Sequence, residues 1–260
     1  MCLSEINGIY LNQSEVLLKF KTLVHGFTAR MGGVSKGEYD SLSLSPRRGD
    51  DIECVRENEK ILCSALGFNH KRLTSTAQEH TDNIKVIEKE HIGYGITTLW
   101  DEGVDGIITQ LKDVPLICYS ADCVPVLFYS NDIEAIAAVH SGWRGTDKKI
   151  AEKTVKKLVE MGANPQNIYA AIGPCIGICC YEVSEDVAKN FERVYYKEKP
   201  DGKYMLDLGK INFDMINKCG VPKENISLSG ICTKCRNDLF FSHRAQNGKS
   251  GTLGGIICMR

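Results

Sequence analysis

Short apolar runs dominate the middle of the chain and recur near its end. Four of them follow one another closely, at residues 104–109, 115–120, 125–130 and 135–140. Their near-continuous apolar character is typical of strands that are covered on both faces. Later segments share this strand composition: 167–173, 224–230, 239–244 and 254–260. The pattern predicts a core made mainly of β-strands.

Two other segments place apolar residues at helical spacing between clear start and stop signals. The first runs from Asp50 to Gly67, with aspartates as N-terminal caps and glycine as the stop. The second begins at Thr146 and Asp147 and ends at Gly162. Strands that outnumber helices predict the α/β class in its mixed α+β form, a layered sandwich of mixed β-sheet covered by helices.

The length of the chain favours one domain over residues 1–260. At about 150 residues per domain the chain holds fewer than two, and it contains no internal repeat, low-complexity tract or long Pro/Gly/Ser linker. A chain of this size buries roughly 70–75% of its unfolded surface, so its core needs no disulfide or metal for stability.

Composition and charge exclude several classes of protein. The hydrophobic fraction of 43% and the charged fraction of 25% are those of an ordinary globular protein. The net charge of −1 argues against binding to nucleic acid or to a membrane surface, since both need a basic excess. One local basic cluster is still compatible with a small anionic substrate.

The cysteines and the first residues favour a cytoplasmic location. Glu5 and Glu15 interrupt the first twenty residues, which contain no apolar stretch of signal-peptide length. No window reaches the roughly 18 apolar residues of a membrane span. The twelve cysteines are therefore expected to be reduced thiols, some of them in the core.

Three residues at strand ends and in a polar loop are candidates for a metal site. Cys123 precedes one predicted strand, His140 ends the next, and His80 lies in the loop Gln78-Glu79-His80. One thiolate and two imidazoles form a suitable three-ligand zinc set with a fourth position for water. Cys123 and His140 also fit a nucleophile–base pair, and each of the three residues also fits an ordinary position in a core or on a surface.

The residues after His140 suggest an anion site. Gly142 and Gly145 permit close approach of backbone amides, and Arg144 adds a charged fork before the helix that Thr146 opens. This is no P-loop, because the required Gly-Lys-Ser/Thr order is absent. The glycines also fit a simple turn, with Thr146 as an ordinary cap. Arg30 lies in a second glycine turn, before Gly32-Gly33.

Two further cysteine groups carry weaker signals. Cys232 and Cys235 form a lone C-x-x-C, which without a partner pair is more often structural than metal-binding or redox-active. The segment with Cys175, Cys179 and Cys180 nearly matches the P-C-x-x-C half of a zinc nucleobase deaminase. Its spacing is one residue too long and no H-x-E precedes it, which excludes that family.

Taken together, the motifs of the chain resemble the YfiH family, once labelled polyphenol oxidase or multicopper laccase and now regarded as purine nucleoside phosphorylases. The resemblance runs from about residue 25 to the C-terminus. Its motifs occur in the family's order: His25-Gly26-Phe27-Thr28-x-Arg30-x-Gly32-Gly33-Val34-Ser35, Gly49-Asp50, Gln78-x-His80, Ala121-Asp122-Cys123-x-Pro125, His140-Ser141-Gly142-Trp143-Arg144-Gly145-Thr146, Gly173-Pro174-x-Ile176-Gly177-x-Cys179-Cys180-Tyr181-Glu182-Val183 and Phe240-Phe241-Ser242-x-Arg244.

The resemblance implies a single α/β domain and a zinc site at His80, Cys123 and His140. It implies phosphorolysis of adenosine, inosine, guanosine and S-methyl-5′-thioadenosine, and hydrolytic deamination of adenosine. Zinc is the expected metal, with copper as the alternative. Phosphorolysis needs phosphate beside the sugar C1′, and Arg30, Arg144 and Thr146 are the candidates for holding it.

Some positions depart from the family pattern, and other functions remain open. Glu79 and Thr81 flank His80, where the family often has Val and Gly, and Thr252 replaces a frequent arginine; Ser43 replaces a frequent asparagine. One alternative is a Cys/His hydrolase that edits peptidoglycan precursors.

Two further alternatives concern the metal. A copper phenol oxidase would need His-rich clusters, and six scattered histidines cannot form a multicopper centre. A non-catalytic zinc-binding protein would need a fourth protein ligand, for which Cys118 or His91 is the candidate.

Overall fold

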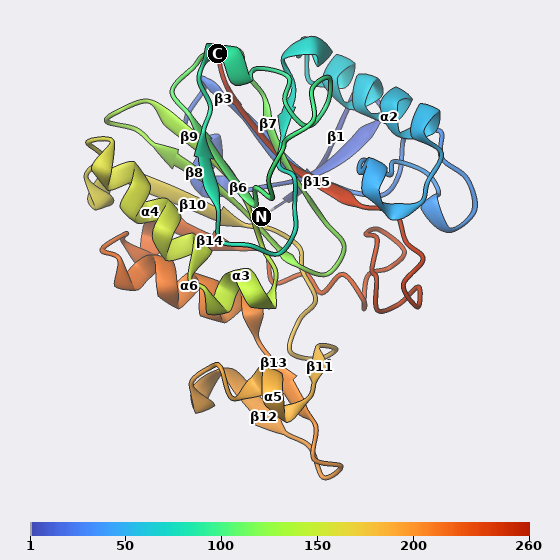
Figure 1. Ribbon diagram of the computed structural model, residues 1–260, viewed down its shortest axis with the longest axis vertical. Helices are drawn as coiled ribbons and strands as arrows, with labels where there is room; N and C mark the ends of the chain where they lie inside the picture. The colour runs from blue at the N-terminus through green and yellow to red at the C-terminus, as the bar shows by residue number, and fades with distance from the viewer. Residues whose placement is uncertain (1) are drawn as a thin grey trace.

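The computed structural model describes residues 2–260, and two large sheets form its centre (Figure 1). The first sheet has the strand order β1 (Cys2–Ile6), β2 (Ile9–Gln13), β3 (Leu23–Thr28), β15 (Leu253–Met259), β7 (Leu116–Ser120) and β4 (Thr74–Ser75). The second has the order β14 (Ile226–Leu228), β10 (Ile168–Ile172), β8 (Val124–Ser130), β9 (Ala135–Ser141), β6 (Gly106–Thr109) and β5 (Ile84–Val86). Parallel pairs, such as β10 with β14, occur beside antiparallel ones, so both sheets are mixed.

Strand β8 explains why the middle of the sequence is continuously apolar. Leu127 and Tyr129 belong to the core between the two sheets, together with Leu116 of β7. Val126 and Phe128 point the other way, into the core under the helices. Because side chains alternate across a strand, a strand between two cores needs apolar residues at every position. The predicted doubly covered strands are confirmed.

Helices cover the outer faces of both sheets and complete the layers. The helices are α1 (Glu15–Leu18), α2 (Ile52–Ala65), α3 (Trp143–Asp147), α4 (Ile150–Glu160), α5 (Glu185–Ala188) and α6 (Leu208–Lys218). The short 3₁₀ turns are η1 (Gly37–Tyr39), η2 (Pro46–Arg48), η3 (His70–Arg72), η4 (Lys89–His91), η5 (Pro165–Asn167), η6 (Arg193–Tyr195) and η7 (Lys223–Asn225). Helix α2 packs on the first sheet through Leu62, and α4 and α6 pack on the second through Leu158 and Ile211. The predicted layered sandwich is confirmed.

Helix α2 follows its sequence signals closely. The Asp51 side chain accepts a hydrogen bond of 2.8 Å from the amide of Glu53, and Gly67 follows the helix with φ of 67°. Within residues 2–260, no helix combines the length and the apolar character that a membrane span requires.

A third, small sheet projects from one end of the molecule (Figure 1). It consists of β11 (Glu182–Val183), β13 (Tyr204–Leu206) and β12 (Tyr196–Glu198), with α5 beside it. Leu206 and Val183 join the core under α4 and α6. The assignment of residues 1–260 to one domain stays a prediction.

The second predicted helix begins differently from the expectation. Thr146 does not open a helix: it lies inside α3, and its Oγ1 is 2.9 Å from Ser141 Oγ. Lys149 then adopts left-handed φ of 63°, which separates α3 from α4. The long helix starts only at Ile150. The N-cap residues of α3 and α4 are Gly142 and Lys149, and neither caps its helix through a side chain, so the Thr146-Asp147 signal placed the start of the long helix too early.

Residues 239–244 do not form the predicted strand. Their apolar members, Phe240 and Phe241, are buried against Ala29, Ala121 and Leu253. The amide of Phe240 donates to the carbonyl of Arg236 in a turn, so this backbone has no ladder partner. The apolar pair anchors a loop, which periodicity alone cannot distinguish from a short strand.

Candidate functional site

The end of the β8–β9 pair brings Cys123 and His140 together. Pro125 of β8 is paired with His140 of β9, and Val124 is paired with Ser141. Cys123, one residue before β8, therefore lies beside the end of β9. His80 approaches from the loop between β4 and β5 and has φ of 59°. The fold thus brings the three residues together, and their role as metal ligands stays a prediction.

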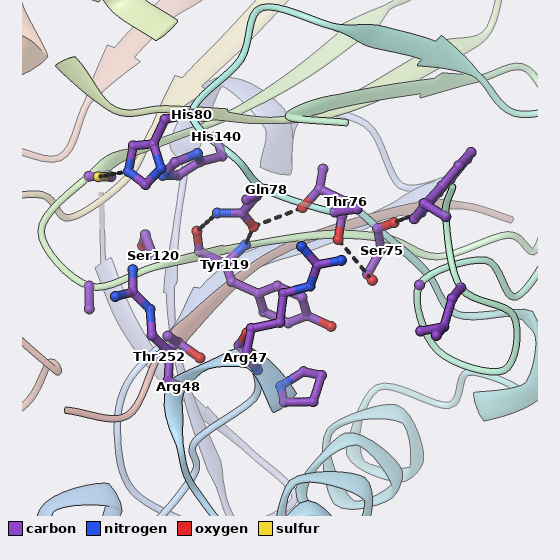
Figure 2. Close-up of a pocket in the computed structure, with 18 residues that line it drawn as sticks. Arg47, Arg48, Ser75, Thr76, Gln78, His80, Tyr119, Ser120, His140 and Thr252 are labelled. Carbon is purple, nitrogen blue, oxygen red and sulfur yellow. Dashed lines mark hydrogen bonds between the residues drawn. The ribbon is translucent and has the colours of Figure 1, made fainter. Parts of the chain in front are cut away.

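The three donor atoms are arranged as metal ligands would be. One ligand atom from each of His80, Cys123 and His140 lies within 4.8 Å of the other two. The Cys123 Sγ is 3.8 Å from His80 Nε2, and the two imidazole rings are nearly perpendicular at 89°. Figure 2 shows the two rings next to each other at one side of the cavity. A thiolate and two imidazoles suit zinc, and also copper.

Asp105 holds this arrangement in place, and its role escaped the sequence analysis. Its buried carboxylate lies 2.7 Å from His140 Nδ1 and accepts hydrogen bonds from the amides of Glu79, His80 and Thr81. Because Nδ1 donates to Asp105, Nε2 is the nitrogen of His140 that would bind a metal, which would displace the Nε2 proton of the imidazolium. Asp105 thus orients one imidazole directly and the other through its loop. A lone carboxylate before the apolar strand β6 is the signal that was present in the sequence.

Electrostatics stabilise the charged forms of these side chains. Burial tends to raise the pKa of Asp105, but the bonds from His140 and the loop amides hold it below its usual value. Burial also tends to raise the pKa of Cys123, yet attraction to His140 and hydrogen bonds with both imidazoles lower it to about 6. For His140, Cys123 and Asp105 outweigh burial and raise the pKa to about 9. Cys123 is therefore a thiolate near neutral pH.

Because Gly142 has no side chain, His80 and Cys123 can lie close to its backbone. A Cβ at this position would lie 2.7 Å from His80 Cδ2 and 3.2 Å from Cys123 Sγ. We predict that Gly142→Ala displaces the His80 ring and weakens zinc binding by about 10- to 100-fold, measured by competition with a chelator. Gly145→Ala is the control, since its Cβ would approach no ligand atom. Equal zinc affinity in both variants would contradict this assignment.

A cavity of about 400 Å³ opens beside the three donor atoms (Figure 2). This volume lies in the range of small-molecule sites. Its walls come from η2, from the ends of β4, β7 and β9 and from the loops around the site: Ser45, Pro46, Arg47, Arg48, Ser75, Thr76, Ala77, Gln78, His80, Gly95, Leu99, Trp100, Tyr119, Ser120, Ala121, Cys123, His140 and Thr252. Apolar and aromatic groups are thus combined with polar groups and two cations.

Several polar groups of the cavity are poised for a ligand. Ser120 Oγ and Thr252 Oγ1 are buried and have no hydrogen-bond partner within residues 2–260. Arg47 lies 3.7 Å from the Glu79 carboxylate. In the described part of the chain, no carboxylate is within 4.0 Å of the Arg48 guanidinium. Buried polar groups are normally paired, so the two hydroxyls indicate a polar ligand.

The loop that carries His80 is fixed by Gln78. Its Nε2 donates to the carbonyl of Tyr119 at 2.7 Å, and its Oε1 accepts from the Tyr119 amide at 2.7 Å and from Thr76 Oγ1 at 2.8 Å. Figure 2 shows these bonds between the histidine pair and the arginines. The Gln78-x-His80 motif therefore has a structural basis: Gln78 positions the loop, and His80 offers the donor atom.

The three residues expected to hold phosphate lie outside this cavity lining. Arg30 donates to the carbonyls of Asp40 and Asn237. The Arg144 guanidinium stacks on the Trp143 ring at 4.6 Å. Thr146 is buried and lies 2.9 Å from Ser141 Oγ. Their role with phosphate stays a prediction, whereas the cavity presents Arg47 and Arg48, which the sequence analysis did not single out.

The two candidates for a fourth, closing ligand are engaged elsewhere. Cys118 is buried in β7, and its Sγ donates to the carbonyl of Val139 at 3.4 Å. His91 stacks on Trp100, and its Nδ1 accepts from the amide of Glu88. Neither side chain belongs to the group formed by the three donor atoms. The donor set therefore remains open toward the cavity.

Comparisons with known proteins match nearly the whole chain. Residues 24–260 match the family described as multi-copper polyphenol oxidoreductase laccase. A protein of Bacteroides thetaiotaomicron named purine nucleoside phosphorylase is 34% identical over 254 residues, which cover 94% of each chain. Purine nucleoside phosphorylase YlmD of Geobacillus stearothermophilus is 35% identical, over 93% of this chain and 92% of its own.

Solved structures have the same fold. The hypothetical protein YfiH of Bacillus licheniformis aligns with a TM-score of 0.92 at 29% identity, over 99% of both chains. YlmD of Geobacillus stearothermophilus aligns with a TM-score of 0.92 at 33% identity, over 99% of this chain and 98% of its own. By its motifs, its fold and these matches, the chain belongs to the YfiH family, whose members are also described as multi-copper polyphenol oxidoreductase laccases.

Proposed function

We propose that this protein is a zinc-dependent purine nucleoside phosphorylase whose reaction takes place where His80, Cys123 and His140 meet the cavity. The observation that carries the proposal is a set of three potential metal ligands beside a cavity that is also lined by Arg47 and Arg48. Relatives named purine nucleoside phosphorylase match more than nine-tenths of the chain, which supports a nucleoside phosphorylase-like function. The expected substrates are adenosine, inosine, guanosine and S-methyl-5′-thioadenosine.

The donor set fits a catalytic zinc ion. Three protein ligands with one open position, and an aspartate behind one histidine, are the usual composition of such a site. When bound, zinc would polarise an oxygen or activate a water molecule, which suits deamination of adenosine to inosine at C6. Copper also accepts one cysteine and two histidines. Of the metal-ligand groups found in residues 2–260, however, this is the one that contains histidine, so a multicopper centre lacks its other ligands.

Phosphorolysis breaks the bond between C1′ of the ribose and N9 of the purine. A phosphate oxygen forms the new bond to C1′, and the departing base takes up a proton. Arg48 lines the cavity and has no ion-pair partner among residues 2–260. Its guanidinium would hold phosphate through charge-assisted hydrogen bonds. Ser120 and Thr252 would supply hydrogen bonds to the nucleoside, while Trp100 and Leu99 offer apolar surface for the purine.

The proposal is tested by incubating the purified protein with adenosine, with and without phosphate, and separating the products by chromatography. Adenine and ribose 1-phosphate are expected only with phosphate, whereas inosine is expected under both conditions. Absence of all three products from zinc-loaded protein would refute the proposed function. Eleven free cysteines within the described residues suit a reducing compartment, and we propose a cytoplasmic location for the activity.

Arg48 lines the cavity and Arg144 does not, so substitutions of these two arginines distinguish between two phosphate sites. We predict that Arg48→Ala raises the KM for phosphate about 10- to 100-fold, because a hydrogen bond to a charged group contributes about 1.5–3 kcal/mol. Zinc content and deamination should change little. Arg144→Ala is the matched variant, and it should affect the phosphate KM less. If Arg144→Ala gives the larger increase, phosphate binds on the side of the turn after His140 instead.

A second function is favoured by one observation, the hydrogen-bonded series Cys123, His140 and Asp105. A thiolate with a pKa of about 6 beside an oriented imidazole is also the arrangement of a cysteine nucleophile. A hydrolase of this kind would release an amino acid from a peptidoglycan precursor without metal. Such release by chelator-treated protein, together with no product from adenosine, would establish this alternative.

A further inference from the structure

A second group of potential metal ligands lies outside the cavity described above. Cys179 and Cys180 belong to the loop between β10 and β11, and Cys232 and Cys235 belong to the loop between β14 and β15. The four sulfur atoms all lie within 4.8 Å of one another. Cys235 Sγ is 3.6 Å from Cys179 Sγ and 3.4 Å from Cys180 Sγ. More than fifty residues of sequence separate the two pairs.

These distances suit a metal ion better than a covalent bond. Zinc–sulfur bonds of about 2.3 Å in a tetrahedron place neighbouring sulfur atoms about 3.8 Å apart. Sulfur atoms in a disulfide are only about 2.05 Å apart. A Cys₄ set is a closed ligand set of the structural type, in contrast to the open set of His80, Cys123 and His140.

The backbone around the four cysteines already joins the two loops. Cys175 and Cys232 form an isolated parallel bridge, and the amide of Thr233 donates to the carbonyl of Cys175 at 3.1 Å. The amide of Gly177 donates to Cys232 Sγ at 3.3 Å. A hydrogen bond from a backbone amide to sulfur stabilises a thiolate. The ligands are therefore positioned by bonds that do not depend on the metal.

The burial and charge around the four cysteines also favour one metal ion that is coordinated by protein ligands alone. Cys232 is buried, Cys180 is partly buried, and Cys179 and Cys235 lie at the surface. Cys232-x-x-Cys235 has the spacing of one arm of a zinc knuckle. Four thiolates around one divalent cation leave a charge of about −2, and the basic residue Lys234 directly precedes Cys235 in sequence.

We propose that Cys179, Cys180, Cys232 and Cys235 bind a structural zinc ion that fastens the loop before β11 to the loop before β15. This second zinc site is separate from the proposed catalytic site and carries no reaction.

The zinc-fastened loops contact the residue beside the catalytic cysteine. Thr233 Oγ1 donates to Asp122 Oδ1 at 2.6 Å, and the amide of Ile176 donates to the Asp122 carbonyl at 2.9 Å. The amide of Arg244 donates to Asp122 Oδ2 at 2.7 Å. Asp122, with φ of 89°, directly precedes Cys123. The second zinc site would thus support the backbone that presents Cys123.

The test measures zinc content in full-length protein purified anaerobically. The wild type should contain about two zinc ions per chain, and Cys123→Ala should contain about one. X-ray absorption at the zinc edge of Cys123→Ala should give four sulfur neighbours at about 2.3 Å. Neither measurement requires activity, so the second site can be judged even if the proposed reaction is refuted.

Substitution of the two exposed ligands identifies the site. Cys179→Ser with Cys235→Ser should remove about one zinc per chain and leave the ion at the histidine site. Cys54→Ser is the control, because Cys54 belongs to neither ligand group. Zinc bound through nitrogen in Cys123→Ala, unchanged zinc in the double variant, or recovery of the four thiols as disulfides from anaerobic protein would each overturn the proposal.

Discussion

Cys123→Ala is expected to remove the proposed catalytic zinc and to reduce the proposed phosphorolysis by more than about 100-fold. Removing a residue that merely orients a ligand already costs about 10- to 100-fold, and Cys123 is itself one of three donors within 4.8 Å. His140→Ala should act similarly, because it removes the imidazole that stabilises the thiolate. Zinc content by elemental analysis and phosphate-dependent release of base from adenosine are the measurements.

Cys219→Ala provides the control for this experiment. Cys219 is also partly buried, yet it belongs to neither group of potential ligands. It should retain the zinc content and activity of the wild type. The assignment is wrong if Cys123→Ala and His140→Ala keep the full wild-type zinc content and activity.

Asp105→Asn is expected to lower zinc affinity and kcat/KM by about 10- to 100-fold. The asparagine keeps the size of the side chain, but its amide lacks the charge that holds His140 and three loop amides. His140 is then no longer held in the tautomer that carries its proton on Nδ1 and offers Nε2 to the metal. Zinc affinity, measured by chelator competition, is the readout that a purely structural role would leave unchanged.

Asp132→Asn is the matched variant for Asp105→Asn. The Asp132 carboxylate also organises a loop, since it accepts bonds from Ser130 Oγ and the amide of Asn164. It is not among the residues around the cavity or the metal ligands. Both variants should lower thermal stability, but only Asp105→Asn should weaken zinc binding. Equal zinc affinity in the two variants would show that Asp105 stabilises the fold but does not position a metal ligand.

Local sequence patterns predicted the central strands because every residue of these strands is buried. Strands β8 and β9 are buried at every position between two cores, and this produces the continuous apolar runs of the sequence. Residues 239–244 have a similar composition, but their phenylalanines anchor a turn. The difference lies in long-range contacts with Ala29 and Leu253, which no local pattern contains.

The residues of the candidate site were likewise predicted only in part. Cysteine and histidine at the ends of consecutive strands indicated a metal site, because antiparallel neighbours bring such ends together. Asp105 was missed since its partners come from two separate segments, the loop 79–81 and the end of β9. Arg48 was missed because it belongs to a short turn, η2, whose position against the cavity depends on tertiary packing. The sequence analysis also weighed each cysteine pair by itself, and only the fold joins Cys179 and Cys180 to Cys232 and Cys235.

The most direct test of zinc-dependent phosphorolysis is phosphorus NMR of adenosine and phosphate incubated with metal-free and zinc-reconstituted protein. We expect a ribose 1-phosphate signal from the zinc-loaded wild type, no such signal after chelation, and its return when zinc is restored. Cys123→Ala should give no signal in any of these states. Formation of ribose 1-phosphate at an undiminished rate by fully metal-free protein, or its absence from zinc-loaded protein, would contradict the proposed function.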